Sequence, residues 1–372
     1  MSKDTIAFVS TYFHPSRDSI EQMLREAFPD YRFENISTLD IVKHHKSWIA
    51  PNLLYVMKEY GAGLLQGRGT VRERYFLTTY LFRKLRQAMR QVIDPARHAF
   101  SFSTQSLYDT GVPGVPHFIY TDHTHLTSLA SPYFDRRLLR PPEWLALERT
   151  VYHNATRVFT RSTNVSADVD RLYGVAPEKV VCVYAGSNVA EVKQPLDEKR
   201  YAQRRILFVG GDWERKGGPV LAEAFRRVLQ TYPDARLTIV GSNPQLDLPN
   251  CDVLGNLPLE EVGHHYARAT VFCLPTRLEP FGIAFLEAMA YALPIVATSV
   301  GAVPDMVEHG VNGRLVQPGD VDALAAELIE LLGDPELCRR YGESGRRRVL
   351  ENYNWTRVGQ RIREQIQPFL AQ

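Results

Sequence analysis

The chain has 372 residues, more than one hydrophobic core usually supports, so we expect two domains of about 180 residues each. Its composition, with 44% hydrophobic and 23% charged residues, is that of a soluble globular protein. No stretch of about 18 apolar residues is present, and the first residues lack the charged-then-apolar pattern of a signal peptide, which argues against a membrane-spanning or secreted protein. We therefore predict a cytoplasmic location.

The net charge of +2 hides a difference between the two halves of the chain. Residues 1–190 hold 23 Lys and Arg against 18 Asp and Glu, whereas the remaining residues hold 21 against 24. Part of the excess of positive charge lies in residues 68–90, which contain one acid, Glu73. The cations of this segment are Arg68, Arg72, Arg74, Arg83, Lys84, Arg86 and Arg90. Interleaved apolar residues make this segment amphipathic, which fits either peripheral contact with an anionic membrane at its inner face or a half-buried domain helix with a solvated basic face. Nucleic-acid binding is not expected, because no recognised binding motif accompanies the cations.

The first half alternates strand-like and helical runs. The expected strands cover residues 5–10, 98–103, 117–121, 157–160 and 180–184, and the clearest amphipathic helices cover 141–154 and 162–173. Strands that alternate with helices predict an α/β domain with a parallel sheet. A polar, charged stretch at 190–205 interrupts the alternation and is predicted to be a linker.

The second half begins with a strand at 206–209 that runs into a glycine-rich loop containing Arg215 and Lys216. A helix and a strand at 236–240, which ends in Gly241, complete a βαβ unit. Ligands of open α/β sheets bind beyond the carboxyl ends of the strands, where the two cations of this loop are expected. A short strand at 251–254, a helix at 260–267 and, near the end, a helix at 321–332 capped by Asp320 follow.

Residues 270–300 combine a strand, a Pro-rich loop, a helix at 282–293 and a second strand. Glu287 is the only charged residue of that helix, which is apolar on all sides and should be buried. A buried carboxylate needs hydrogen-bond donors or becomes protonated. Glu279 precedes the helix, where free backbone N–H groups and the helix dipole favour an anion. The loop is therefore expected to bind a polar ligand.

Glu279-Pro280-Phe281-Gly282 followed by Glu287 forms an E-x7-E motif between strand and helix. In this setting the motif resembles retaining nucleotide-sugar glycosyltransferases of the GT-B fold, specifically glycosyltransferase family 4. The resemblance spans most of residues 150–360. It implies two Rossmann-like domains with parallel sheets facing an interdomain cleft: an acceptor-binding domain at 1–190, a nucleotide-sugar-binding domain at 191–353, and a terminal helix at 354–372 that crosses back to the first domain.

The resemblance also implies roles for the motif. Glu279 would contact hydroxyls of the transferred sugar, and Glu287 would accept bonds from the ribose diol. Arg215 and Lys216 would stabilise the departing diphosphate, because Arg offers a bidentate fork and Lys a compact charge. Backbone N–H groups at the helix start would add to this stabilisation; they belong to Phe281, Gly282 and Ile283. The alternatives are a helix-capping Glu279, a core Glu287 paired with an Arg, and solvated loop cations.

Other predicted site residues belong to loops that follow strands. Gly210, Gly211, Gly241 and Asn188 are predicted to approach the donor, although turn formation explains Asn188 equally well. In the first domain, His123 is the predicted catalytic histidine, with His125 second and Asp122 as an orienting partner; the alternative is a polar turn bonded to itself. 

The chain departs from the family pattern at two places. Gly211 stands where many members have an Arg, so one diphosphate cation is missing or is supplied by Arg215. The Gly-Gly near the first strand is absent, because residues 10–16 read Ser-Thr-Tyr-Phe-His-Pro-Ser. This leaves the first domain's contacts with acceptor and diphosphate undefined.

No metal or cofactor is expected. The cysteines, at positions 182, 251, 273 and 338, lack metal-ligand spacing, and the paired histidines at 44–45 and 264–265 would point to different sides of a helix. The resulting prediction is a retaining glycosyltransferase that moves a sugar from a nucleoside-diphosphate sugar to an acceptor hydroxyl by front-face attack. The acceptor is a carbohydrate, a lipid-linked molecule or a small molecule. The alternatives are a non-catalytic nucleotide-sugar-binding protein and a GT-B phosphorylase or epimerase, whereas a dehydrogenase is disfavoured because the loop at 210–218 lacks G-x-G-x-x-G.

Overall fold

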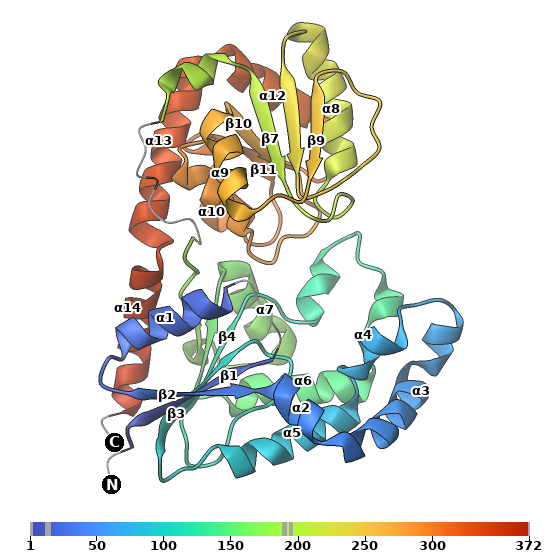
Figure 1. The fold of residues 1–372 in the computed structure, drawn as a ribbon, viewed down its shortest axis with the longest axis vertical. Helices are drawn as coiled ribbons and strands as arrows, with labels where there is room; N and C mark the ends of the chain where they lie inside the picture. Colours follow the sequence, from blue (N-terminus) through green and yellow to red (C-terminus); the bar gives the residue numbers. More distant parts are fainter. Residues whose placement is uncertain (1–2, 12–15, 188–191, 193–195, 371–372) are drawn as a thin grey trace. The chain divides into compact units, whose positions relative to one another are not determined.

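The computed structural model describes residues 3–11, 16–187, 192 and 196–370. They form two compact units, one comprising Met1–Tyr184 with Val358–Gln372 and the other comprising Ala185–Arg357. Each unit contains one six-stranded parallel sheet surrounded by helices (Figure 1). The predicted α/β class with two Rossmann-like parallel sheets is thereby confirmed. The division falls six residues before the expected boundary at residue 190.

The sheet of the first unit has the strand order β2-β1-β3-β4-β5-β6. Its strands are β1 (Thr5–Ser10), β2 (Arg32–Ser37), β3 (His98–Thr104), β4 (His117–Thr121), β5 (Arg157–Thr160) and β6 (Val180–Cys182). Its helices are α1 (Arg17–Ala27), α2 (Thr38–His44), α3 (Ile49–Leu65), α4 (Val71–Tyr75), α5 (Thr79–Val92), α6 (Pro142–Asn154), α7 (Thr163–Tyr173) and most of α14 (Trp355–Ile366). The polar strand β2 was not predicted; it lies at the sheet edge, where only Ile36 is buried.

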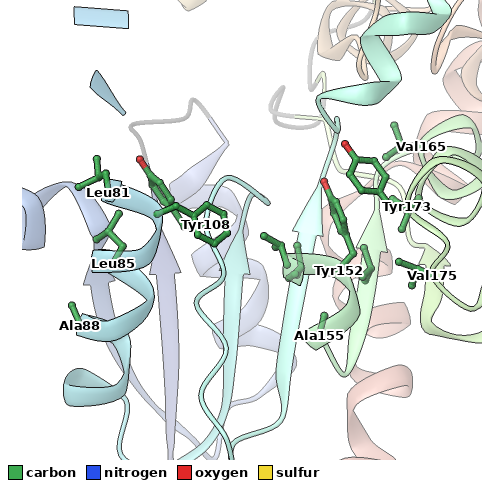
Figure 2. Packing of buried hydrophobic residues seen from close by; sticks show 14 of the residues in the cluster. Leu81, Leu85, Ala88, Tyr108, Tyr152, Ala155, Val165, Tyr173 and Val175 are labelled. Carbon is green, nitrogen blue, oxygen red and sulfur yellow. The ribbon is translucent and has the colours of Figure 1, made fainter. Parts of the chain in front are cut away.

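The side chains of α5 form part of the first unit's hydrophobic core. Leu81 and Leu85 are fully buried and belong to the same cluster as Tyr108, Tyr152 and Tyr173 (Figure 2). The apolar face that suggested membrane contact for residues 68–90 is therefore turned inward along α5. The alternative, a half-buried domain helix with a solvated basic face, describes this helix.

The sheet of the second unit has the strand order β12-β11-β10-β7-β8-β9. Its strands are β7 (Arg205–Val209), β8 (Arg236–Val240), β9 (Cys251–Gly255), β10 (Val271–Leu274), β11 (Ile295–Thr298) and β12 (Gly313–Val316). Its helices are α8 (Gly218–Thr231), α9 (Leu259–Arg268), α10 (Ile283–Ala290), α11 (Val303–Met306), α12 (Val321–Gly333) and α13 (Pro335–Asn352). The predicted cap of α12 is confirmed, because the carboxylate of Asp320 accepts a bond from the N–H of Ala323 at 2.9 Å.

The predicted linker at 190–205 is wrong in its second part. Residues Glu198–Ala202 form a 3-10 helix in which Arg200 is only 2% exposed. Its guanidinium donates to the carbonyl oxygens of Tyr291 (2.6 Å) and Ala292 (3.1 Å), just after α10 ends. The negative end of a helix dipole favours a cation there. This part of the charged stretch is therefore anchored to the second unit by a buried arginine.

The end of the chain packs on the first unit. Val358, Ile362 and Ile366 of α14 are buried, and the ring of Phe369 lies 5.9 Å from that of Phe118 in β4. Arg363 donates to the carbonyl oxygen of Ala27 at 2.5 Å. The C-terminal residues therefore complete the unit formed by the start of the chain.

Candidate functional site

Two glycine loops meet at the carboxyl ends of β7 and β8. Gly241 has φ +88°, and a Cβ there would lie 3.0 Å from the carbonyl carbon of Gly210. The hydroxyl of Ser242 donates to the carbonyl oxygen of Gly210. Gly211 is less constrained, since its Cβ would meet the nearest atom at 3.6 Å, an ordinary contact. Close backbone packing thus requires Gly241, whereas Gly211 tolerates a side chain sterically.

The loop after β7 is held against the loop after β10. Gly217 has φ +76°, and a Cβ there would come within 1.9 Å of the carbonyl oxygen of Pro275. Arg215 bridges the same two loops: its Nη1 donates to the carbonyl oxygen of Leu278 at 3.0 Å, and its Nε to the carboxylate of Asp212 at 3.2 Å. Any side chain at position 217 would therefore separate the two loops.

Lys216 and Glu279 form the most buried ion pair of this site. The ammonium group of Lys216 donates to Oε2 of Glu279, and the side chains are 12% and 4% exposed. The two residues come from the ends of β7 and β10, so the sheet brings together groups 63 positions apart in sequence. Solvated and helix-capping roles are both wrong for this pair, because α10 is capped by Gly282 without a side-chain bond. Each group balances the charge of the other.

The carboxylate of Glu279 stands at the start of α10. Gly282 has φ +92°, and a Cβ there would lie 3.0 Å from Cγ of Glu279. The main-chain oxygen of Glu279 accepts a hydrogen bond from the N–H of Ala302 at 3.2 Å. Gly301 makes this contact possible, because a Cβ added at that position would lie 2.1 Å from the same oxygen. The first N–H groups of a helix have no partners inside it, so those at Ile283 and its neighbours can bind an anion.

Glu287 lies on α10 and is 8% exposed. Burial raises the pKa of its carboxyl group to about 7, although the hydroxyl of Tyr266 donates to Oε2 at 3.0 Å. The alternative of a core Glu287 paired with an Arg is wrong: among the described residues, the side-chain partner of Glu287 is Tyr266 of α9. Sequence reasoning missed this tyrosine, whose signal is its position four residues after the buried Val262 on an amphipathic helix. Oε1 is left without a partner in the described chain and can accept bonds from a ligand.

The first unit has its own cavity, of about 340 Å³, where β3 and β4 end. The cavity is lined by Gln105, Ser106, Leu107, Thr121, Asp122, His123, Thr124, His125, Ser128, Arg140 and Glu148. Nε2 of His123 lies 2.8 Å from the hydroxyl of Ser128, whereas Nδ1 is buried and has no hydrogen-bond partner in the described chain. Burial lowers the pKa of His123, so the imidazole is neutral at pH 7.

His125 lines the same cavity with a fixed tautomer. The N–H of Arg140 donates to its Nε2 at 3.0 Å, so Nδ1 carries the proton in the neutral ring. Burial lowers the pKa of His125 to about 3. His123 and His125 thus line one cavity, and a carboxylate oxygen of Asp122, the expected orienting partner, lies 3.5 Å from Nη1 of Arg161.

Glu148 is a cavity residue that sequence reasoning missed. It is 2% exposed, and its carboxylate accepts from the N–H of His125 (3.0 Å) and the hydroxyl of Tyr173 (2.6 Å). Burial raises its pKa. The available signal was helical spacing, because Glu148 follows Trp144 by four positions on the buried face of α6. An acid on an apolar face has a partner or a ligand.

Some predicted residues have no structural outcome. Asn188 and residues 12–15 of the first loop lie outside the described residues. In the part of the chain that is described, no group of three or more His, Cys, Asp or Glu side chains could hold a metal ion. The same residues include no helix long and apolar enough to cross a membrane.

The two parallel six-stranded sheets define the fold as GT-B. Sucrose-phosphate synthase from Thermosynechococcus elongatus has a TM-score of 0.73 at 19% identity, with 99% of each chain covered. WaaG, a glycosyltransferase involved in lipopolysaccharide biosynthesis, has a TM-score of 0.67 at 17% identity, covering 97% of this chain and 99% of its own. Anabaena Alr3699/HepE in complex with UDP-glucose has a TM-score of 0.67 at 16% identity, covering 98% and 99%. At these identities the likeness shows the fold alone.

The match to a family model lies in the second unit. Residues 203–334 match the family described as Glycosyl transferases group 1. The MMP alpha-(1->4)-mannosyltransferase of Mycolicibacterium hassiacum is 33% identical over 227 residues, which cover 58% of this chain and 54% of the relative. The GDP-mannose-dependent alpha-(1-6)-phosphatidylinositol monomannoside mannosyltransferase of Mycolicibacterium smegmatis is 34% identical over 168 residues, covering 40% and 44%. The chain spans about half the length of these relatives. It carries a group 1 glycosyltransferase region on a GT-B fold, as the resemblance predicted. Assignment to family 4 stays a prediction.

Proposed function

We propose that the protein is a retaining glycosyltransferase that moves a sugar from a nucleoside-diphosphate sugar to an acceptor hydroxyl. The observation that carries the proposal is the buried Lys216–Glu279 ion pair at the start of α10, inside the region that matches group 1 glycosyltransferases. A carboxylate that accepts sugar hydroxyls and a cation that accepts a diphosphate are the two groups this reaction needs side by side.

In this proposal the donor separates the ion pair. The diphosphate oxygens bind the ammonium group of Lys216 and the backbone N–H groups of Phe281, Gly282 and Ile283, which releases Glu279 to accept bonds from hydroxyls of the sugar. Arg215 already joins the two loops, and its side chain is 38% exposed. It supplies the second cation, in place of the arginine that many family members have at the position of Gly211. The free Oε1 of Glu287 accepts a bond from the ribose diol.

The transfer step breaks the bond between the anomeric carbon and the diphosphate oxygen. The acceptor oxygen forms the new bond on the same face of the sugar, and its proton passes to the departing diphosphate. This route needs no protein nucleophile and no metal ion. Neutral His123, which lines the first unit's cavity, is proposed to bind a hydroxyl of the transferred sugar or of the acceptor.

Carbohydrate, lipid-linked and small-molecule acceptors are all compatible with a polar cavity. The relatives also leave the nucleotide open, since one is named for GDP-mannose and one solved neighbour contains UDP-glucose. Incubation with UDP-, GDP- and ADP-sugars and an acceptor panel, read out by nucleotide release and by NMR of the product anomer, tests the proposal. A product that retains the donor's anomeric configuration is expected. An inverted product would contradict the mechanism, and donor binding without turnover would favour the non-catalytic alternative.

A further inference from the structure

Helix α3 places large apolar side chains in solvent. Ten large hydrophobic residues are strongly exposed in the described chain, and six of them lie between positions 49 and 71. These six are Ile49 (46%), Leu53 (40%), Leu54 (71%), Met57 (55%), Leu65 (86%) and Val71 (44%). Single exposed apolar residues are ordinary, but a concentration of this kind marks an interaction surface.

The exposed residues of α3 form one continuous face of the helix. Ile49, Leu53 and Met57 follow one another at four-residue spacing, and Leu54 and Leu65 extend the same side. In Figure 1, α3 lies at the edge of its unit, away from the sheet and close to α4 and α5. We refer to these five side chains as the α3 apolar face.

Three polar side chains of α3 bond to the segment that follows it, and the buried residues of the helix are Asn52, Val56 and Gly61. Asn52 is fully buried and donates to the carbonyl oxygen of Tyr75 at 2.8 Å. The hydroxyl of Tyr60 donates to the carbonyl oxygen of Leu77 at 2.6 Å. The carboxylate of Glu59 accepts from the hydroxyl of Thr79 at 2.5 Å. These bonds fix the rotation of the helix, so its apolar side cannot simply turn inward.

Three exposed cations lie on α3 and on the two elements next to it in the chain, together with two acids. Lys46, Lys58 and Arg72 are exposed. The carboxylate of Glu73 accepts from the N–H of Thr70 at 2.8 Å as part of a capping box, and that of Glu59 is bonded to Thr79. An exposed apolar stripe with basic residues nearby in the chain matches the interface of a bilayer with anionic headgroups.

We propose that the α3 apolar face is a docking surface for an anionic lipid bilayer. Helix α3 would lie in the plane of the interface, with Leu54 and Met57 among the acyl chains and Lys58 at headgroup level. The α5 part of segment 68–90 takes no part in this contact, because its apolar side chains are buried in the core, whereas Arg72 of α4 in the same segment contributes a cation. It does not depend on the proposed glycosyltransferase activity, because docking is measured without turnover.

Sedimentation with vesicles tests the proposal on the full chain. Vesicles of phosphatidylcholine mixed with phosphatidylglycerol should bind the protein, and added salt should weaken the binding. The double variant Leu54→Glu/Met57→Glu should lower the partition coefficient by about a hundredfold or more. Neutralisation in Lys58→Gln/Arg72→Gln should lower it by about 25-fold and flatten the salt dependence. Leu350→Glu, at a residue of α13 that is 53% exposed, is the matched control and should bind like the wild type.

Three results would overturn the proposal. One is no binding of the wild-type protein to anionic vesicles, and another is equal binding by the Leu54→Glu/Met57→Glu variant with an unchanged melting temperature. The third is self-association measured by analytical ultracentrifugation without vesicles and abolished in that variant, which would assign the face to a second copy of the chain. Because Leu54 and Met57 are exposed, these substitutions should leave the fold intact, and thermal melting checks this directly.

Discussion

The second unit's loop site and the first unit's cavity use different electrostatics. The loop site contains opposite charges in a buried contact, Lys216 with Glu279, and a second buried carboxylate, Glu287. The cavity is lined by two imidazoles, His123 and His125, that burial keeps neutral. The ion pair of the loop site suits a charged diphosphate, and the two neutral imidazoles of the cavity, whose lining also includes Asp122, Arg140 and Glu148, suit hydroxyl groups. The difference explains why a short charged motif identifies the second unit whereas no motif identifies the first.

Removal of Lys216 should give the largest effect. Lys216→Ala leaves the buried carboxylate of Glu279 unpaired, so we expect unfolding by denaturant to show a loss of about 3–5 kcal/mol, together with at least a hundredfold lower transfer rate. The double variant Lys216→Met/Glu279→Gln should regain most of the stability without regaining transfer. A single variant as stable as the wild type would show that the pair is not buried in solution.

Glu287→Gln should separate stability from function as pH changes. Burial raises the pKa of Glu287 from 4.5 to about 7 in the folded protein, so the folded state binds the proton more tightly than the unfolded state does. The protonated carboxyl therefore contributes stability that is fully present below pH 4.5 and lost as pH rises through 7.

The variant, which cannot ionise, should be more stable than the wild type by up to about 3 kcal/mol above pH 8 and equal to it below pH 5. Denaturant titrations across this range measure the difference. An offset that does not change with pH would contradict the raised pKa. Binding of the donor nucleotide should be weaker in the variant at every pH.

His123→Ala should affect transfer but not the donor loops. Loss of a hydrogen bond to a hydroxyl predicts a rate lower by about 10- to 100-fold, with nucleotide affinity unchanged. His125→Ala, in the same cavity, serves as the comparison. If His123→Ala instead weakened nucleotide binding and left transfer intact, the assignment of the cavity to hydroxyl recognition would be wrong.

Arg215→Lys should be the mildest of these changes. Lys keeps the charge but cannot bind both Asp212 and the carbonyl oxygen of Leu278, so the loop loses one of its contacts. We expect KM for the donor to rise by about tenfold with little change in kcat. Steady-state kinetics with varied donor would show this, and a lower kcat at unchanged KM would place Arg215 in the transition state alone.

The sequence predicted the parts of the fold that have strong local patterns. Apolar runs predict most strands of both sheets. The helix that contains Glu287 has no other charged residue and is predicted to be buried. The strands β2 and β12 were missed because both lie at sheet edges, where polar residues such as Arg314 are tolerated. Long-range hydrogen bonds explain the error in the predicted linker. Arg200 is buried because it donates to the carbonyl oxygen of Tyr291, which is 91 positions away in the sequence.

The site was predictable where backbone constraints accompany the motif. Gly282, Lys216 and Glu279 are set by loops that follow strands, and the parallel sheet brings those loops together. Tyr266 and Glu148 were not predicted because their partners, Glu287 and His125, come from distant segments. The remaining sequence signal is a polar residue on an otherwise apolar helix face. Such a residue must have a hydrogen-bond partner, but the sequence does not identify that partner.

Thermal unfolding with nucleotides tests the central claim most directly. Wild type, Glu287→Gln and Lys216→Ala would be melted with UDP, GDP or ADP at about a hundred times the dissociation constant, where binding adds about 2.7 kcal/mol of stability. We predict stabilisation of the wild type by one base, and a smaller gain for each variant over its own nucleotide-free melt. No stabilisation of the wild type by any of the three nucleotides, or equal stabilisation of all three proteins, would contradict the assignment of the Lys216–Glu279 region to a nucleotide sugar.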